Sequence, residues 1–272
     1  MPSGILYVVA TPIGNLSDIT FRAVEILKSV DFIACEDTRN SSVLCDRYDI
    51  KTRLISYHKF SENERLELFL GYLREGKTIA LISDAGTPLI SDPGSKLVEK
   101  VREEGFKVVP VGGISAVTTL LSAIAREEES FKFTGFLPRS EKQIEELLEA
   151  SRCENLVFYE SPKRLLKSLG VIKKTLDNPK IAIGRELTKR FEEIIVDDTE
   201  SIISHFSENT LKGEIVGMIY AQKKSADEDE IIKKIKQLKQ VKLSNKEIAV
   251  TISELYGYPK NKVYDLVLAA EI

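Results

Sequence analysis

The sequence lacks the residues on which several protein classes depend. Its 272 residues include only three cysteines and two histidines. No two of Cys35, Cys45 and Cys153 form a C-x-x-C pair, which argues against a disulfide framework or a zinc site and favours a reducing cytoplasm. His58 and His205 are too few and too far apart in the sequence for a histidine-based metal centre. We therefore expect no metal.

Long apolar segments are missing as well. The first apolar run, residues 5–10, is too short for the core of a signal peptide and no basic region precedes it. No other run approaches the length of a membrane span. The net charge of −3 gives no general attraction to nucleic acid, so any such site must be a local basic patch. These features predict a soluble, cytoplasmic protein with no membrane partner.

The common dinucleotide-binding fingerprint is also absent. Residues 5–10 predict a buried strand, and the next residues, 11–16, read T-P-I-G-N-L. This is a proline- and glycine-containing loop, but it does not match G-x-G-x-x-G. A Rossmann-type dinucleotide site at the first strand is therefore excluded.

One stretch, residues 79–94, organises the rest of the chain; it reads I-A-L-I-S-D-A-G-T-P-L-I-S-D-P-G. Residues 79–82 predict a buried strand. Pro88 and Pro93 each fix φ and remove a donor, so the loop does not continue as helix. Gly86 permits backbone angles or close approaches that a Cβ would forbid. Because open α/β sheets bind ligands beyond the carboxyl ends of their strands, this is a candidate ligand loop; the alternative is an ornate strand-to-helix connection.

The order of predicted elements indicates the fold class. Strands alternate with helices up to about residue 126, which is typical of a mainly parallel, helix-covered sheet. In the second half, residues 181–187 and 191–196 are close enough in sequence to pair as an antiparallel hairpin. We predict an α/β fold with an N-terminal α/β domain (1–126), a second α+β domain with a mixed sheet (127–222), and a linker helix with a C-terminal helical hairpin (223–272).

The C-terminal residues leave two interpretations open. Residues 244–247, S-N-K-E, form a capping box that starts a helix, and a further helix follows. The pair could be a small nucleic-acid-binding appendage. Because lysine and glutamate are mixed on its surface, a helical hairpin that packs on its own chain or on a dimer mate is favoured.

Six motifs occur in order between residue 5 and about residue 220. They read V-A-T-P-I-G-N-L, C-E-D-T-R, S-D-A-G-T-P-L-I-S-D-P-G, F-T-G-F-L-P-R, F-Y-E-S-P-K-R-L and G-R-E-L-T-K-R-F-E-E. Each is weak alone, but six in order are specific. Together they resemble the tetrapyrrole-methylase superfamily, and within it the bacterial enzymes that methylate the 2′-oxygen of a cytidine in small-subunit ribosomal RNA. Residues 244–270 are similar to the helical appendage of that group.

This resemblance implies a two-domain tetrapyrrole-methylase-like fold that uses S-adenosyl-L-methionine, held folded in the cleft between the domains. It also implies a homodimer. The implied substrate is a cytidine ribose in the decoding region of 16S rRNA. The sequence does not distinguish free RNA from the assembled small ribosomal subunit as the substrate.

The resemblance also places the cofactor contacts. They fall on Gly14, Asp84, Ala85, Gly86, Thr87, Gly113 and Ile114. The Asp84 carboxylate can accept a hydrogen bond from the amino group of the cofactor. It can equally cap a turn of its own loop, and both roles stay open.

Charged side chains at predicted strand ends are candidates for the chemistry. A ribose 2′-hydroxyl is a poor nucleophile until its proton is removed or its oxyanion is stabilised. The candidates are Glu36, Asp37, Arg39, Glu160, Lys163, Glu186 and Lys189. We predict Glu36, Arg39, Glu186 and Lys189 as the catalytic, substrate-handling residues, without assigning the base. Their carboxylates would take or orient the proton and their cations would hold RNA phosphate. The alternative for each is an ordinary surface charge.

A basic helix is predicted after Glu160. It carries Lys163, Arg164, Lys167, Lys173 and Lys174. Contact with the RNA backbone is one interpretation, and a solvated helix face is the other.

Two positions depart from the family pattern. Gly112 stands where the family commonly has proline, which predicts a more flexible cofactor wall. Lys163 stands where many members have histidine, which indicates that a histidine there is not an obligatory base.

Two other functions remain open. One is a superfamily methyltransferase acting on a tetrapyrrole or other small molecule, against which C-E-D-T-R and the appendage argue. The other is a non-catalytic RNA-binding module that uses residues 244–270, against which the intact loops at residues 11–16 and 83–94 argue.

Overall fold

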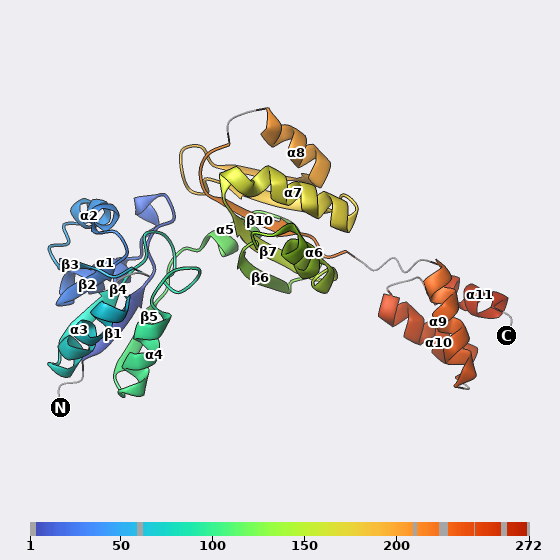
Figure 1. Cartoon of the computed structure of the whole chain (residues 1–272), viewed down its shortest axis with the longest axis horizontal. Helices are drawn as coiled ribbons and strands as arrows, with labels where there is room; N and C mark the ends of the chain where they lie inside the picture. The colour runs from blue at the N-terminus through green and yellow to red at the C-terminus, as the bar shows by residue number, and fades with distance from the viewer. Residues whose placement is uncertain are drawn as a thin grey trace.

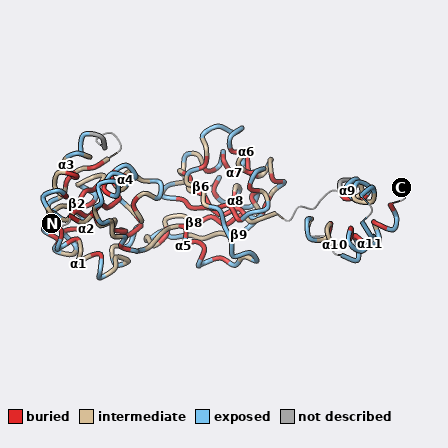
Figure 2. The backbone as a smooth tube through the Cα atoms, turned by 90° about the horizontal axis from the view of Figure 1, so that it is seen from below, coloured by how far each residue is buried: buried red, intermediate tan, exposed pale blue. Residues whose placement is uncertain are grey.

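The computed structural model describes residues 4–58, 62–208, 211–222, 228–241, 243–256 and 260–270. Two five-stranded sheets, each covered by helices, are followed by a group of three C-terminal helices (Figure 1). Buried residues concentrate in the strands and on the inner faces of the helices (Figure 2). The predicted α/β class is confirmed.

The first sheet is parallel throughout. Its strands are β1 (Ile5–Val9), β2 (Phe32–Cys35), β3 (Arg53–Ser56), β4 (Thr78–Leu81) and β5 (Lys107–Val111). They lie in the order β3-β2-β4-β1-β5. The loops that follow β1, β4 and β5 therefore leave the same edge of the sheet from three adjacent strands.

Helices cover both faces of this sheet, because residues alternate between the faces along each strand. On one face α1 (Phe21–Ser29) and α2 (Thr38–Arg47) bury Leu27 and Leu44 against Ile33. On the other, α3 (Glu62–Arg74) and α4 (Ser95–Glu103) bury Leu70 and Leu97. A short 3₁₀ helix, Leu16–Asp18, follows the first loop.

The second sheet is mixed, as predicted. Its strands are β6 (Phe131–Phe136), β7 (Asn155–Glu160), β8 (Lys180–Arg185), β9 (Glu193–Asp198) and β10 (Ile215–Ile219), in the order β6-β7-β10-β8-β9. β6 and β7 run parallel, whereas β10 is antiparallel to both of its neighbours. The predicted antiparallel pairing of β8 and β9 is confirmed.

One face of the second sheet packs against α6 (Glu141–Ala150), α7 (Pro162–Leu176) and α8 (Thr199–Ser207). The sequence pattern did not predict α8. The opposite face packs against α5 (Ala116–Ser122), whose Leu120 and Leu121 lie with Ala182, Val216 and Met218. Figure 1 shows α5 beside the second sheet although it directly follows β5 of the first.

The position of α5 bears on the domain division. The proposed boundary after residue 126 assigns α5 to the N-terminal domain by sequence, yet its buried side chains belong to the core of the second sheet. The helix is therefore a shared element between the two sheets. The division into residues 1–126, 127–222 and 223–272 stays a proposal.

The C-terminal helices are α9 (Glu228–Gln240), α10 (Asn245–Tyr256) and α11 (Lys260–Ala269). They share an apolar core that includes Ile231, Ile248 and Val263. The predicted capping box is present: the backbone N–H of Glu247 donates to Ser244 Oγ, and the N–H of Ser244 donates to the Glu247 carboxylate. Residues 223–227 of the predicted linker lie outside the described residues. No helix in the described ranges is both long and apolar enough to span a bilayer.

Candidate active site between the two sheets

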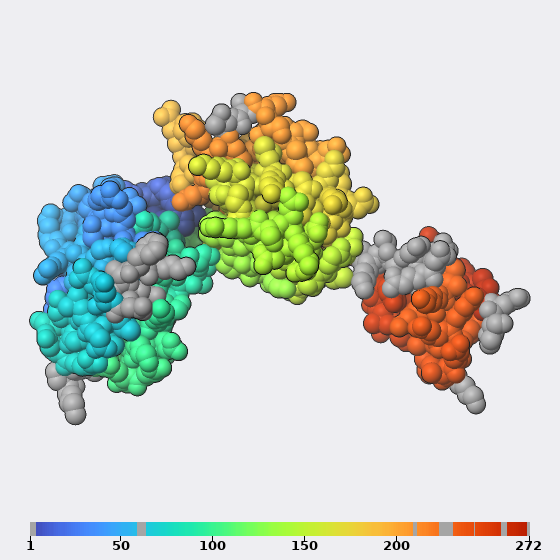
Figure 3. Space-filling view, viewed as in Figure 1, coloured from blue at the N-terminus to red at the C-terminus, as the bar shows by residue number. Residues whose placement is uncertain are grey.

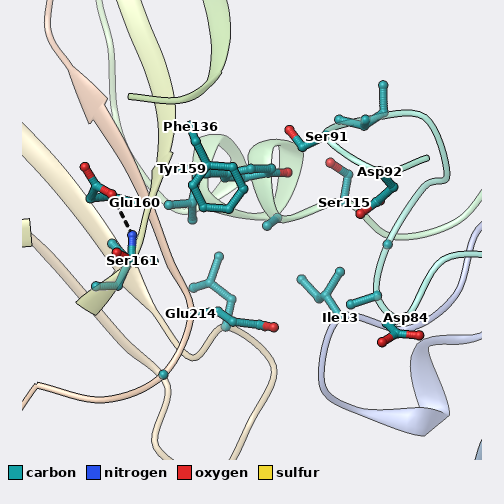
Figure 4. A pocket seen from close by; sticks show the side chains of 18 of the residues that line it. Ile13, Asp84, Ser91, Asp92, Ser115, Phe136, Tyr159, Glu160, Ser161 and Glu214 are labelled. Carbon is teal, nitrogen blue, oxygen red and sulfur yellow. Dashed lines mark hydrogen bonds between the residues drawn. The ribbon is translucent and has the colours of Figure 1, made fainter. Parts of the chain in front are cut away.

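A cavity of about 390 Å³ lies where the two sheets meet. Figure 3 shows the blue to teal residues of the first sheet in contact with the green to orange residues of the second. The cavity is lined from both sides, by loops after β1, β4 and β5 and by the ends of β6, β7 and β10 (Figure 4). This is the edge at which a parallel sheet binds its ligands.

The loop after β4 forms the first wall. Asp84, Ala85, Gly86 and Thr87 all line the cavity, as their predicted cofactor role requires. Gly86 has φ +78° and exchanges two backbone hydrogen bonds with Thr11 in the loop after β1. Its positive φ is the reason for glycine at this position. The two strand-end loops are thereby fixed to each other.

The Asp84 carboxylate is held by its neighbours. Asn40 Nδ2 donates to Oδ2 at 2.8 Å, and the backbone N–H of Asp37 donates to Oδ1 at 3.2 Å. Both donors lie in or next to α2, so Asp84 links the loops after β2 and β4. The predicted alternative, that Asp84 caps a turn of its own loop, is replaced by this contact between two loops.

Three carboxylates share this edge of the sheet. Burial and the nearby charge of Glu36 raise the pKa of Asp92 to about 6. Burial, then the charge of Asp84, raises the pKa of Glu36 above its usual value. Asp92 lines the cavity together with Asp84. In the folded protein Asp92 therefore keeps its proton to a higher pH than an ordinary aspartate, although it is mostly ionised at pH 7.

Arg39 does not reach the cavity lining. Its guanidinium donates to the Asp37 carboxylate, with Nε at 3.0 Å from Oδ1, and its side chain is exposed. Asp37 is also the N-cap of α2, where it accepts from the backbone N–H of Arg39. Hydrogen bonds from Arg39 lower the pKa of Asp37 to about 2. Arg39 lies at the outer rim, where a phosphate contact remains its proposed role.

The second wall is aromatic. Phe136 at the end of β6 and Tyr159 at the end of β7 both line the cavity, with ring centroids 5.6 Å apart in an edge-to-face arrangement. In Figure 4 the two rings lie together, and Asp92 and Asp84 lie on the other side of the cavity. Burial raises the pKa of Tyr159, so its hydroxyl stays protonated at neutral pH.

Glu160 was among the seven charged candidates for the chemistry, but its carboxylate is fully engaged in local hydrogen bonds and an ion pair. Its carboxylate accepts from Ser168 Oγ at 2.6 Å and from the backbone N–H of Ser161 at 2.8 Å, and lies 3.2 Å from the guanidinium of Arg164. Its side chain is fully buried. Glu160 is among the residues that line the cavity, and its carboxylate holds the start of α7.

The loop between β8 and β9 brings Glu186 and Lys189 together. Lys189 Nζ lies 2.8 Å from Glu186 Oε1 and 3.0 Å from Glu214 Oε2. Burial opposes the charge on Lys189, but hydrogen bonds with these two carboxylates raise its pKa. Burial also opposes the charge on Glu186, yet its bonds to Lys189 and to the Glu214 backbone lower its pKa. Glu214 and Leu187 line the cavity beside this charged group.

The same loop touches the N-terminal part of the chain at Gly14. A Cβ on Gly14 would lie 2.4 Å from Lys189 Cγ, so only glycine allows this approach. The backbone N–H of Asn15 donates to Thr188 Oγ1 at 3.1 Å. Gly14 therefore serves contact between the two halves of the chain and is outside the cavity lining.

Gly113 and Ile114 also lie behind the lining. A Cβ on Gly113 would come 2.8 Å from the Cβ of Ala10, so glycine is needed there for packing against the end of β1. Ile114 packs with the apolar cluster under α5. Their role as cofactor contacts remains a prediction.

The two departures from the family pattern are at solvent-facing places. A Cβ on Gly112 would meet no atom within 4 Å. Lys163 is exposed in the first turn of α7 and does not line the cavity.

The basic face of α7 is largely paired with acids. Lys167 lies 2.9 Å from Glu141, and Lys173 lies 2.8 Å from Glu200. These acids come from α6 and α8, which flank α7. The contacts favour a solvated, ion-paired face over an RNA-binding one.

Several cavity residues were not singled out from the sequence. They are Asp92, Ser115, Phe136, Tyr159, Gly213 and Glu214. Asp92, Phe136 and Tyr159 lie within the quoted motifs, at strand ends or in the loop after β4. Their position at strand ends, or in the loop after β4, was the sequence signal that could have identified them. Which strand ends come together at the cavity depends on how the two sheets pack.

Comparisons with known proteins agree with this geometry. Residues 5–203 match the family profile of the Tetrapyrrole (Corrin/Porphyrin) Methylases. The chain is 42% identical to the ribosomal RNA small subunit methyltransferase I of Pasteurella multocida (strain Pm70), over 96% of each protein. It is 42% identical to the protein of the same name from Escherichia coli O157:H7, over 97% of this chain and 95% of that protein.

Solved structures show the same fold at much lower identity. Diphthine synthase superposes with a TM-score of 0.66 at 14% identity, over 80% of this chain and 90% of that one. A cobalt precorrin-4 methyltransferase superposes with a TM-score of 0.59 at 13% identity, over 80% and 94%. Because the family profile covers most of the chain and relatives about 40% identical cover nearly all of it, this chain belongs to the tetrapyrrole methylases.

Proposed function

We propose that this chain is a methyltransferase that uses S-adenosyl-L-methionine to methylate the ribose 2′-oxygen of a cytidine in 16S rRNA. The cavity between the two sheets carries this proposal, because Asp84, Gly86 and Thr87 of the family's motif line it from one side. The names of the relatives support a ribosomal RNA substrate. The cytidine 2′-position follows from the resemblance of the motifs.

The residues present suit the cofactor. A volume of about 390 Å³ lies in the usual range for small-molecule sites. The lining is mostly apolar, with a few polar groups at fixed positions, among them Asp84 and Thr87. Asp84, Ala85, Gly86 and Thr87 would hold S-adenosyl-L-methionine, which supplies an electrophilic methyl group on a sulfonium centre. The bridge between Thr11 and Gly86 keeps their backbone rigid, which favours in-line positioning.

Charged groups for the substrate lie on both sides of the cavity. Asp92 lines it on the first-sheet side and Glu214 on the second. Glu36 lies near Asp92, and Glu186 and Lys189 lie beside Glu214, but these three are not among the lining residues. Burial and the charge of Asp84 raise the pKa of Glu36, which makes its carboxylate a stronger base than an ordinary glutamate. We propose that Glu36 takes or orients the 2′-hydroxyl proton, with Glu186 on the opposite side, and that Lys189 and Arg39 hold RNA phosphates.

We also propose a cytoplasmic homodimer. Phe21 in the first turn of α1 is almost fully exposed, and Phe191 in the loop between β8 and β9 is largely exposed. Aromatic side chains are enriched at protein–protein interfaces relative to the rest of the surface. The three cysteines are free, as expected in a reducing compartment. Light scattering on the purified protein measures its oligomeric state.

The test is cofactor binding followed by methyl transfer. Calorimetry measures S-adenosyl-L-methionine binding by the wild type and by Asp84→Ala. Removing the carboxylate takes away an acceptor that lines the cavity and also releases Asn40, so affinity should fall at least ten-fold. Small ribosomal subunits lacking the modification should accept a labelled methyl group from the wild-type enzyme, and a tetrapyrrole should not.

Asp46→Ala is the matched control, because Asp46 is exposed near the end of α2, away from the cavity. It should bind and transfer like the wild type. Wild-type protein that is folded but binds no S-adenosyl-L-methionine would overturn the proposed function. Binding of the cofactor with transfer only to small molecules would replace the RNA substrate while keeping the enzyme class.

A further inference from the structure

Phe136 is an exposed aromatic side chain on the cavity wall. Its side chain is 56% exposed, yet it lines the cavity. An exposed aromatic ring forgoes the favourable free energy of removing its apolar surface from water. The residue belongs to the motif F-T-G-F-L-P-R, to which the proposed reaction assigns no role.

A β-bulge directs this side chain. Along β6 the pairing with β7 passes from Phe133↔Val157 to Phe136↔Tyr159, so three steps on β6 oppose two on β7. Gly135 lies in this bulge with φ +69°, a conformation that favours glycine. Bulges commonly re-aim a side chain beside an active site. Without the extra residue, the alternation of the strand would change the face to which residue 136 belongs.

The backbone that directly follows Phe136 is anchored. The N–H of Leu137 donates to the Tyr159 carbonyl at 3.2 Å, and Arg164 Nη2 donates to the Leu137 carbonyl at 2.8 Å. Arg164 is in turn held by the buried Glu160. An exposed ring on a fixed backbone loses little entropy when a planar ligand stacks on it.

Tyr159 supports the ring from behind. The edge-to-face contact with Phe136 at 5.6 Å is matched by a second one, with Phe133 at 5.0 Å. The hydroxyl of Tyr159 also bonds to Ser115, at the start of α5. Phe136 and Tyr159 form an aromatic wall that faces Asp84 and Asp92 across the cavity (Figure 4), and Phe133 packs against Tyr159 outside the lining.

We propose that the exposed face of Phe136 is the platform on which the base of the target nucleotide stacks once that nucleotide has turned out of its stack in the RNA. This rests on the proposed function. Proteins that read single-stranded RNA stack unpaired bases on aromatic side chains. Enzymes that modify a base take the nucleotide out of its stack, and we extend this to a ribose that must enter a cavity between two domains.

Geometry assigns the platform to the RNA base and not to the adenine of the cofactor. The cofactor residues Asp84 and Thr87 lie on the opposite wall, at the carboxyl end of β4. A small cofactor is enclosed within a cleft, whereas a base attached to a polymer must enter from solvent. Phe136 as a whole residue is more than half exposed, so it meets solvent as well as the cavity.

Activity measurements test this role through a series at one position. Phe136→Ala should raise the KM for small ribosomal subunits roughly ten-fold or more, since alanine substitution removes a stacking contact. Phe136→Tyr should retain most of the affinity. Phe136→Leu keeps the apolar character but not the flat ring, so it should behave like the alanine variant. The affinity for S-adenosyl-L-methionine should be unchanged in all three.

Phe131→Ala is the matched control. Phe131 begins the same strand and is 42% exposed, but it does not line the cavity. This variant should have the KM of the wild type.

A spectroscopic reporter tests stacking without any need for activity. The chain contains no tryptophan, so Phe136→Trp introduces a single tryptophan, which can be excited selectively over the nine tyrosines. Unmodified small subunits, or an RNA fragment of the decoding region, should quench its emission. The same RNA should leave the emission of a Phe131→Trp variant unchanged.

The outcomes of these experiments separate the stacking role of Phe136 from the alternatives. An unchanged KM in Phe136→Ala, or full function in Phe136→Leu, would overturn the stacking role. Loss of cofactor binding in folded Phe136→Ala would assign the ring to the adenine. If the wild type binds the cofactor but neither methylates nor binds small subunits, the proposed RNA substrate itself fails. That outcome is distinct from a platform failure, in which the wild type stays active.

Discussion

Thr188 and Asn15 join the two halves of the chain by a direct hydrogen bond. The backbone N–H of Asn15, after β1, donates to Thr188 Oγ1, in the loop between β8 and β9, at 3.1 Å. The two residues are separated by 173 positions in the sequence. Beside them, Gly14 allows the Lys189 side chain to pass over the backbone. This contact fixes the loop after β1 relative to the second sheet, and thus fixes one edge of the cavity.

Removing this bond should loosen the cavity. Thr188→Val keeps the shape of the side chain but removes the accepting oxygen. A single hydrogen bond contributes about 0.5–1.5 kcal/mol net, so we expect a two- to ten-fold loss of S-adenosyl-L-methionine affinity. Calorimetry measures it. Thr188→Ser retains the hydroxyl and should bind like the wild type; equal affinities for the valine and serine variants would show that the contact does not shape the site.

Replacing Lys189 with methionine should destabilise the fold in a pH-dependent way, because it removes the cation that Glu186 and Glu214 share. The variant keeps the aliphatic stem but leaves Glu186 and Glu214 without their shared cation. Glu186 has a lowered pKa, so its favourable contribution is present above its unfolded value and is lost as the pH falls. We expect a loss of about 1 kcal/mol at neutral pH that shrinks below about pH 4.

Thermal unfolding across this pH range measures the effect. Lys174→Met is the control, because Lys174 is exposed and lies 3.9 Å from its partner Glu145. It should stay within a few tenths of a kcal/mol of the wild type at every pH. A constant difference between wild type and Lys189→Met down to acid pH would contradict the charge-based account.

The raised pKa of Asp92 predicts a stability effect with the opposite pH dependence. Its folded-state pKa is raised from 3.8 to about 6, so the folded protein binds its proton more tightly than the unfolded chain does. Stability therefore falls as the pH rises from about 4 to about 6, and the cost is fully present above that. Asp92→Asn removes the charge and should be more stable than the wild type by about 1–3 kcal/mol at pH 7.

Chemical denaturation at pH 4 and pH 7 separates the two forms. The variant and the wild type should differ little at pH 4, where Asp92 is largely protonated in the folded state. The same change at the exposed Asp46 should alter stability little at either pH. A variant that is less stable than the wild type at pH 7 would show that the Asp92 charge is compensated.

Glu160 should be required for folding more than for chemistry. Glu160→Ala leaves Arg164 and Ser168 without their buried partner. Removing one member of a buried ion pair typically costs 3–5 kcal/mol, and because Arg164 is partly exposed we expect about 2–4 kcal/mol. Urea unfolding measures it. Glu154→Ala removes an exposed acid 3.5 Å from Lys132 and should cost less than 1 kcal/mol.

Local sequence determined most of the fold. Apolar runs such as residues 79–82 and 215–219 are strands, and Pro162 begins α7 at the predicted place. These features depend on neighbours within one turn or one strand, which the sequence displays directly. The loop of residues 83–94 was predicted as a ligand loop for the same reason. Its residues Asp84, Ala85, Gly86 and Thr87 line the cavity.

Only the tertiary structure decided which residues of these local elements meet at the cavity and which are buried. Only the packing of the second sheet against the first shows that Phe136 and Tyr159 face Asp84 and Asp92. Only packing shows that α5 belongs to the core of the second sheet. Glu160 and Glu186 follow similar strands in the sequence, yet one is buried in an ion pair and the other joins Lys189 beside the cavity. Their ion-pair partners are only three or four positions away in the sequence. The depth at which each pair is buried, like the contact between Asn15 and Thr188 across 173 positions, depends on tertiary packing, and no local pattern contains that information.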